Sequence, residues 1–220
     1  MANKRFPAKS FIIPGLLFVY GMASFENDGL QNLNEELKED IYTERPHRKI
    51  AIDNYLQFSP AIAVYGLNAM GLKGKNNFLD RSMIYLMSNA ILGISVYGLK
   101  KISHQLRPDG SGFTSFPSGH TTEAFASAEF LRQEYKHLSP WYGIAGYTVA
   151  LATGYLRMYN NKHWLSDVLA GAGVGIASTK IAYWLYPKIK HKLFKDKKVN
   201  TFVMPVYENK SIGLVLVHKF

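Results

Sequence analysis

Three short clusters of charged and small residues lie between positions 100 and 167 of the sequence. They are Lys100-x6-Arg107-Pro108, Pro117-Ser118-Gly119-His120 and Arg157-x5-His163-x3-Asp167, and each lies at the edge of an apolar segment. A tetrahedral anion is bound by cationic side chains and by the free backbone N–H groups at a helix start. An imidazole can attack it. Together the three clusters predict a phosphate site.

The first cluster supplies two unlike cations. Lys100 and Arg107 are about two helical turns apart at the end of a predicted helix, which Pro108 stops. Arg offers a planar fork that grips two phosphate oxygens, whereas Lys offers a mobile point charge. Two such cations facing one pocket suit a phosphate dianion.

The second cluster is typical of a helix start that binds an anion. Ser118 is a good N-cap residue, and Gly119 lets the backbone approach a ligand closely before a helix begins near His120. The free N–H groups and the positive dipole end of that helix form the cradle, with the Ser118 hydroxyl as an extra donor. His120 is then expected to lie beside the bound anion.

The third cluster pairs an imidazole with a carboxylate and adds Arg157 as a third cation. His163 and Asp167 are four residues apart, so on a helix they lie on one face within hydrogen-bonding reach. A carboxylate on one ring nitrogen fixes the tautomer and leaves the other nitrogen to attack phosphorus. Taken singly, each cluster also has a structural interpretation: a membrane-interface anchor, a capped loop, or a surface ion pair. Their order in one chain favours the functional interpretation.

In this order the clusters resemble the signature of the type 2 phosphatidic acid phosphatase superfamily. That superfamily includes bacterial lipid phosphatases, soluble class A acid phosphatases and vanadate-dependent haloperoxidases. The family pattern is Lys-x6-Arg-Pro, Pro-Ser-Gly-His and Ser-Arg-x5-His-x3-Asp, and the sequence departs from it at one position, where Leu156 stands in place of Ser. The change removes a hydroxyl and affects only fine positioning.

The resemblance implies a role for each matched residue. His163 is expected to form a phosphohistidine, with Asp167 orienting its ring, and His120 is expected to protonate the leaving group. The residues expected to hold the phosphate oxygens are Lys100, Arg107, Ser118, Gly119 and Arg157. No metal and no cofactor is implied, because the three cations would neutralise the developing charge.

Composition limits the alternatives. A chain of 220 residues without a linker is expected to form one main domain, residues 1–198, followed by a tail at 199–220. The absence of Cys excludes a disulfide framework, a thiolate metal site and Cys catalysis. A net charge of +10 is compatible with nucleic acid, anionic lipid, or the positive-inside bias of membrane proteins. The placement of the charges decides between these.

The expected fold is all-α, a helical bundle of about six transmembrane helices with the active site at its outer end. The apolar segments are 11–23, 56–72, 82–99, 120–131, 141–156 and 164–186. The first segment is short and follows a basic start, so it is either an uncleaved span, which we favour, or a signal peptide cleaved near Ala23. Between 26 and 53, apolar residues spaced three and four apart predict an amphipathic helix on the bundle or the bilayer surface.

Charge placement predicts the orientation of this bundle. With a cytoplasmic N-terminus, the segments on the inner side hold sixteen of the 26 Lys and Arg residues. The outer loops hold nine, three of which are the expected phosphate ligands. This excess of Lys and Arg on the inner side agrees with the positive-inside rule. It places the three clusters on the outer, periplasmic side. Most of the positive charge is then explained without nucleic acid.

The C-terminal tail alternates in two strand-like halves around residues 208–211, which predicts a small β-hairpin. A terminal Phe220 on an alternating strand is also typical of outer-membrane barrels, but one hairpin cannot close a barrel.

The expected function is hydrolysis of a phosphomonoester or pyrophosphate on a lipid, at the bacterial inner membrane with the active site facing the periplasm. The sequence does not choose among four candidate substrates: phosphatidate, phosphatidylglycerophosphate, undecaprenyl pyrophosphate and the phosphates of lipid A. The alternatives are a soluble periplasmic acid phosphatase, a vanadate haloperoxidase, and a non-catalytic membrane protein that binds or transports phosphate or lipid. Nucleic acid is not an expected partner, and the sequence carries no sign of the oligomeric state.

Overall fold

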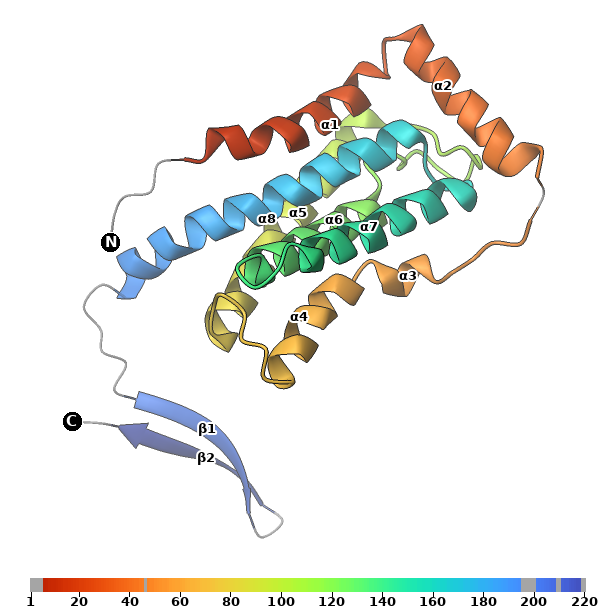
Figure 1. Ribbon diagram of the computed structural model, residues 1–220. Helices are drawn as coiled ribbons and strands as arrows, with labels where there is room; N and C mark the ends of the chain where they lie inside the picture. The colour runs from red at the N-terminus through yellow and green to blue at the C-terminus, as the bar shows by residue number, and fades with distance from the viewer. Residues whose placement is uncertain (1–5, 46, 195–200, 209–210, 219–220) are drawn as a thin grey trace. The chain divides into compact units, whose positions relative to one another are not determined.

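The computed structural model describes residues 6–45, 47–194, 201–208 and 211–218 (Figure 1). The chain divides into two compact units, residues 1–184 and residues 185–220. The first unit is helical. The second contains the end of the last helix and a β-hairpin.

The helices follow one another from the N-terminus with short connections. Their bounds are α1 Ile12–Ala23, α2 Asp28–Lys38, α3 Asp53–Leu56, α4 Ser59–Ala69, α5 Phe78–Ser103, α6 Gly119–Tyr135, α7 Trp141–Tyr159 and α8 Leu165–Phe194. A 3₁₀ turn, Ala8–Phe11, leads into α1, and a π-helical turn, Glu39–Thr43, extends α2. The hairpin strands are β1 Thr201–Glu208 and β2 Ser211–His218, which pair antiparallel from Thr201 opposite His218 to Glu208 opposite Ser211. The domain boundary at residue 198 stays a prediction.

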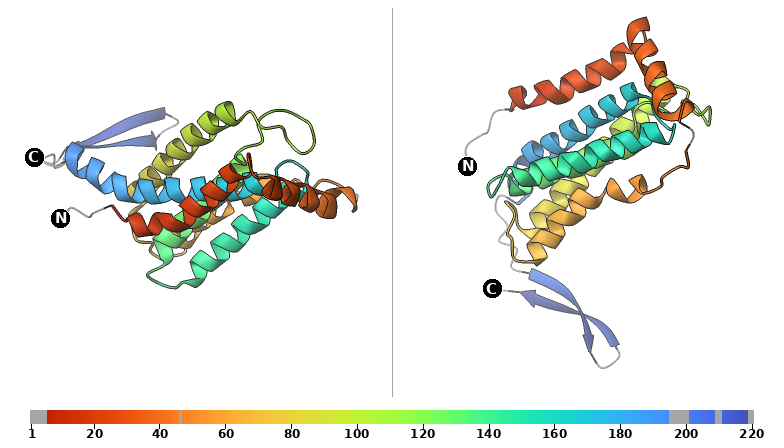
Figure 2. Two further views of the ribbon diagram at one scale, coloured as in Figure 1. Left: turned by 90° about the horizontal axis from the view of Figure 1, so that it is seen from above. Right: turned by 45° about the vertical axis from the view of Figure 1, so that its right-hand side comes forward.

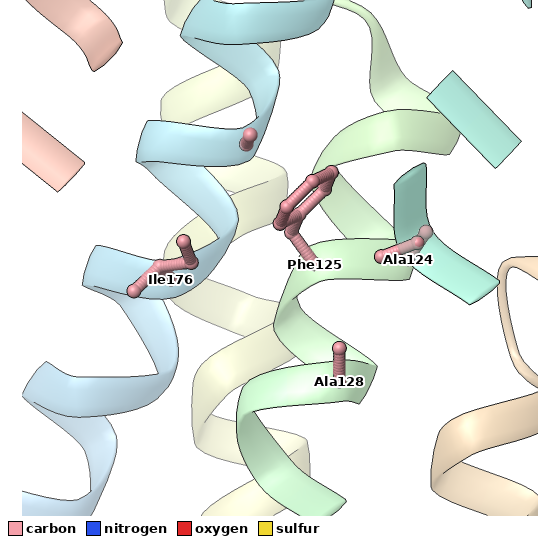
Figure 3. Close-up of a cluster of buried hydrophobic side chains, with 6 residues drawn as sticks. Ala124, Phe125, Ala128 and Ile176 are labelled. Atoms are coloured by element: carbon pink, nitrogen blue, oxygen red, sulfur yellow. The ribbon is translucent and has the colours of Figure 1, made fainter. Parts of the chain in front are cut away.

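Helix α6 is the central element of the bundle, because thirteen of its residues are buried. It packs against α7, α4 and α8. Figure 3 shows one core cluster, in which Ala124, Phe125 and Ala128 of α6 lie beside Ile176 of α8. The backbones of α6 and α8 approach so closely that a Cβ on Gly175 would lie 2.2 Å from the carbonyl oxygen of Thr122. Glycine is therefore required there for packing, not for a loop.

The all-α bundle predicted from the sequence is confirmed. The six predicted apolar segments correspond to α1, α4, α5, α6, α7 and α8. Over the described ranges, two helical stretches are long and apolar enough to cross a membrane, Phe78–Ser103 and Leu165–Lys192, and the pair α1 and α2, bent by 91°, forms a third if it counts as one span. The count of six spans stays a prediction, since α4 has only 11 residues and α6 carries acidic side chains.

The acidic side chains of α6 are buried among polar partners from α5, from α8 and from α6 itself. Glu123 accepts a hydrogen bond from Tyr85 at 2.5 Å, and Glu134 accepts one from Tyr183 at 2.6 Å. The Arg132 guanidinium makes two bonds of 2.6 Å to Glu129. Such pairing is what allows ionisable groups inside a membrane bundle.

Candidate active site

The three sequence clusters meet at one end of the bundle, where α5 ends, α6 begins, and the turn from α7 to α8 lies (Figure 1). The backbone N–H of Ser118 donates to the carbonyl oxygen of Asp167 at 3.1 Å, which ties the start of α6 to the first turn of α8. Lys100 donates to the carbonyl oxygen of Thr114 at 2.5 Å, which ties the end of α5 to the loop before α6. These bonds join segments that are distant in the sequence.

His163 and Asp167 form the pair expected from their spacing. His163 Nδ1 lies 3.3 Å from Asp167 Oδ2, and both residues are buried. The same carboxylate oxygen accepts from Ser115 Oγ at 2.5 Å and from the backbone N–H of Trp164 at 2.9 Å. Because Nδ1 faces the carboxylate, Nε2 is the ring nitrogen left for phosphorus.

Burial lowers the pKa of His163 from its ordinary value to about 4, although the Asp167 carboxylate opposes the shift. The positive charges of Arg157 and Lys100 add to the lowering. His163 is therefore neutral at neutral pH. A neutral imidazole is the form that can attack phosphorus.

The start of α6 has the geometry of an anion cradle. Ser118 is the N-cap, with its hydroxyl accepting from the backbone N–H of Thr121 at 3.4 Å and from the Thr121 hydroxyl at 2.9 Å. A Cβ built on Gly119 would meet no atom within 4 Å, so open space lies beside this residue. The first N–H groups of α6 and the space next to Gly119 together suit a tetrahedral anion.

Two of the cations have donors that lack a protein acceptor. Arg157 Nη1 donates to Asp53 Oδ2 at 2.5 Å. The Nε atoms of Arg107 and Arg157 are buried, and neither has a hydrogen-bond partner among the residues that the structure describes. A buried donor without an acceptor is costly, and a bound phosphate oxygen would satisfy it.

Electrostatics link the cations to both imidazoles. The charges of Arg157, Arg107 and Lys100 all act on His120, and those of Arg157 and Lys100 also act on His163. The structure thus brings together the eight side chains and backbone groups selected from the sequence. Their chemical roles stay predictions. In the described part of the chain, no group of three or more His, Asp and Glu side chains is placed to hold a metal ion.

Three residues at this site were missed by the sequence analysis: Asp53, Asn54 and Ser115. Asp53 pairs with Arg157, and Asn54 Oδ1 lies 2.8 Å from His120 Nε2. Asp53 and Asn54 lie at the start of α3, a helix of four residues with no motif of its own. Ser115 lies two residues before the Pro-Ser-Gly-His cluster, and only the fold shows that its hydroxyl reaches Asp167.

Comparison with known proteins identifies the family of this chain. The family model of the PAP2 superfamily matches residues 81–191, which is half of the chain. The chain belongs to the PAP2 superfamily, and the resemblance inferred from the three clusters is confirmed. With its long apolar helices, it is a membrane protein.

Two curated relatives are similar to this chain over parts of their length. The lipid A 1-phosphatase of Porphyromonas gingivalis is 39% identical over 166 residues, covering 75% of this chain and 36% of the relative. The bacitracin transport permease protein BcrC of Bacillus licheniformis is 33% identical over 100 residues, covering 44% of this chain and 47% of the relative. The chain therefore spans less than half the length of either relative.

Two solved structures are also similar. LpxE from Aquifex aeolicus has 20% sequence identity and a TM-score of 0.45, with 83% of this chain and 99% of the other covered. The transmembrane PAP2-type phosphatidylglycerolphosphate phosphatase from Bacillus subtilis has 18% identity and a TM-score of 0.45, with 85% of this chain and 98% of the other covered.

Proposed function

We propose that this protein hydrolyses a phosphomonoester or pyrophosphate on a lipid through a phosphohistidine intermediate. The observation that carries the proposal is the buried His163–Asp167 pair, on which the charges of Arg157 and Lys100 act. A neutral imidazole held by a carboxylate and surrounded by cations suits nucleophilic attack on a phosphate dianion.

The mechanism has two steps. His163 Nε2 attacks phosphorus, an N–P bond forms, and the bond from phosphorus to the leaving oxygen breaks as His120 gives that oxygen a proton. A water oxygen then attacks phosphorus, its proton passes to His120, and the N–P bond breaks to release phosphate. Because His163 is neutral in the free protein, it needs no general base for the first step. The Arg107 and Arg157 Nε donors and the start of α6 stabilise the charge on the transferring group.

A lipid substrate is favoured over a soluble one by an apolar groove beside the site. The groove has a volume of about 530 Å³ and lies between α1, α5 and α8. Its lining includes Leu99 and Ile102, the near neighbours of Lys100 in α5. An apolar groove that reaches the cationic end of a membrane helix suits an acyl chain whose phosphate lies at Lys100.

Among lipid phosphates, we place lipid A first, because the curated relative at 39% identity is a lipid A 1-phosphatase. Phosphatidate, phosphatidylglycerophosphate and undecaprenyl pyrophosphate stay as further candidates. We also propose that the protein lies in the bacterial inner membrane with its active site facing the periplasm, which the distribution of Lys and Arg supports.

The test is phosphate release by the purified full-length protein from a panel of these lipids and from an aryl phosphate, with EDTA present. We expect release from at least one lipid in EDTA, and a loss of several orders of magnitude in His163→Asn. The matched control is His137→Asn, an exposed histidine beyond the far end of α6, which should keep full activity.

Other outcomes favour the alternatives. Activity on the aryl phosphate alone, in a protein that stays in aqueous buffer without detergent, indicates a soluble acid phosphatase. Halide oxidation that depends on added vanadate indicates a haloperoxidase. Lipid binding that is unchanged in His163→Asn, with no phosphate released by either protein, indicates a non-catalytic membrane protein.

A further inference from the structure

A second group of cations lies at the end of α6 opposite to His120. This group, the Arg132 cluster, consists of Arg132, Lys136 and Lys180. Arg132 is thirteen residues beyond Gly119, which corresponds to about 20 Å along a helix, and Lys180 lies a similar distance along α8 from Leu165. The cluster therefore cannot contact a phosphate bound between His120 and His163.

The cluster carries more positive charge than its protein partner can neutralise. Glu129 is fully buried and accepts from Arg132 Nε and Nη2 at 2.6 Å each, and Lys180 Nζ lies 3.4 Å from it. Lys136 is exposed and donates to the side-chain oxygen of Gln133 at 2.9 Å. Glu129 thus contacts Arg132 and Lys180 and acts on Lys136 only through its charge, so one negative charge is set against three positive ones. Excess charge at the edge of a membrane bundle favours an anion at that place.

Two mainly apolar grooves meet at Arg132. One, of about 430 Å³, lies between α6 and α7 and includes Lys136 and Ile144 in its lining. The other, of about 520 Å³, is lined by α1, α6, α7 and α8 and includes Lys180. Arg132, Tyr147 and Leu151 line both. In the right-hand view of Figure 2, α8 lies between α1 and α7, and all three helices contribute to the second groove.

Arg132 lines both grooves, while two of its guanidinium nitrogens donate to the buried Glu129. The Arg132 side chain is 30% exposed although it pairs with a buried carboxylate. Its stem lies against α7 so closely that a Cβ on Gly143 would be 2.7 Å from Arg132 Cγ. The hydroxyl of Tyr147, which also lines both grooves, donates to Glu129 at 2.6 Å.

We propose that the Arg132 cluster binds one anionic diacyl phospholipid, with the phosphate at the three cations and one acyl chain in each groove. The charge indicates an anionic lipid, because a headgroup with a net negative charge offsets the excess of two cations and a zwitterionic headgroup does not. The two grooves that share Arg132 indicate a lipid with two acyl chains on one headgroup. The site is separate from the proposed catalytic chemistry and does not depend on it.

The test is lipid binding to the full-length protein in detergent micelles, measured by native mass spectrometry. The probes are phosphatidylglycerol, phosphatidylcholine with the same chains, and lysophosphatidylglycerol. We expect phosphatidylglycerol to bind at least about tenfold more tightly than either of the others. The double substitution Lys136→Gln with Lys180→Gln should reduce its affinity to that of phosphatidylcholine.

The control is Lys73→Gln, which removes one positive charge in the turn before α5, outside both grooves. It should leave the phosphatidylglycerol affinity unchanged. Leu151→Trp provides a variant that alters no charge: Leu151 is 63% exposed and lines both grooves, so a larger ring should block the acyl chains and weaken binding.

The proposal is overturned by any of three results. The first is equal affinity for phosphatidylglycerol and phosphatidylcholine. The second is equal affinity for phosphatidylglycerol and lysophosphatidylglycerol. The third is a preference for phosphatidylglycerol that is unchanged in the double lysine variant. The last result would place the lipid elsewhere, for example at the active site. If the double variant does not fold, Leu151→Trp decides in its place, and unchanged affinity in that variant overturns the proposal.

Discussion

Arg157 and Asp53 form a buried ion pair at the proposed phosphate site, with Nη1 2.5 Å from Oδ2. Arg157 is 9% exposed and Asp53 is 1% exposed. The carboxylate occupies one donor of a guanidinium that is expected to bind phosphate. Asp53 is therefore expected to stabilise the free protein and to compete with a bound phosphate for the same cation.

Replacement of Asp53 by Asn should change stability and anion binding in opposite directions. The free protein should lose about 3 kcal/mol, because a buried charge is left without its partner. Inorganic phosphate or vanadate should then raise the thermal midpoint more in Asp53→Asn than in the wild type, because the anion replaces the lost carboxylate. Asp109→Asn, which removes the carboxylate of the more exposed pair with Lys162, is the control. If the anion raises the thermal midpoint less in Asp53→Asn than in the wild type, then Asp53 and the anion do not compete for Arg157.

Asn54 is expected to position His120. The Asn54 side-chain oxygen lies 2.8 Å from His120 Nε2, so it holds the orientation of the ring. Asn54→Ala should lower kcat on a lipid phosphate by roughly tenfold with little change in KM, since general acid catalysis as a whole contributes about a hundredfold or more. The loss should be smaller on an aryl phosphate, because that leaving group needs less help from an acid. An equal loss on both substrates would show that Asn54 does not act through proton transfer.

Much of the site was predictable because its groups lie in short motifs. The spacing of His163 and Asp167 predicts their contact, because residues four apart lie on one face of a helix. Ser118 was recognised as the N-cap of α6 for a similarly local reason. Local geometry of this kind depends on only a few neighbouring residues, so the sequence is sufficient to predict it.

Asp53 and Asn54 could not be found in the same way. They reach the site because the preceding segment is fixed to the end of α7: Asn160 exchanges two hydrogen bonds with the backbone of Ile50, and His47 stacks on Tyr159 at 3.5 Å. Those contacts join residues more than a hundred positions apart, and no periodicity records them. The amphipathic pattern of residues 26–53 predicted a helix, and α2 with its π-helical turn forms one. The pattern gave no sign that residues 47–50, which have no regular secondary structure, lead into α3.

Ser115 should contribute to catalysis less than Asp167 does. Asp167→Asn removes the charge that holds His163 and stabilises its imidazolium, so kcat should fall by roughly a thousandfold or more. Ser115→Ala removes one hydrogen bond of 2.5 Å to that carboxylate and leaves the Trp164 backbone bond in place. A bond to a charged group contributes about 1.5–3 kcal/mol, so a loss of roughly tenfold to a hundredfold is expected. Full activity in Ser115→Ala, measured as kcat on the best lipid substrate, would contradict this assignment.

The low pKa of His163 should make the folded protein sensitive to acid. Burial lowers this pKa to about 4, so between pH 6.5 and 4 the unfolded chain binds a proton that the folded protein does not. Stability from this residue is therefore present at neutral pH and falls as the pH drops through that window. For a shift of this size the loss approaches about 3 kcal/mol.

His163→Asn removes this titration and provides the comparison. The thermal midpoint of the wild type, relative to His163→Asn, should fall steadily from pH 7 to pH 4 in the same detergent. The same comparison with His137→Asn, which replaces an exposed histidine, should show a much smaller dependence on pH. A midpoint difference between wild type and His163→Asn that stays constant from pH 7 to 4 would mean that His163 is not held neutral by burial. In that case Asp167, and not desolvation, would set its charge, and the imidazole would need to lose a proton before it could attack phosphorus.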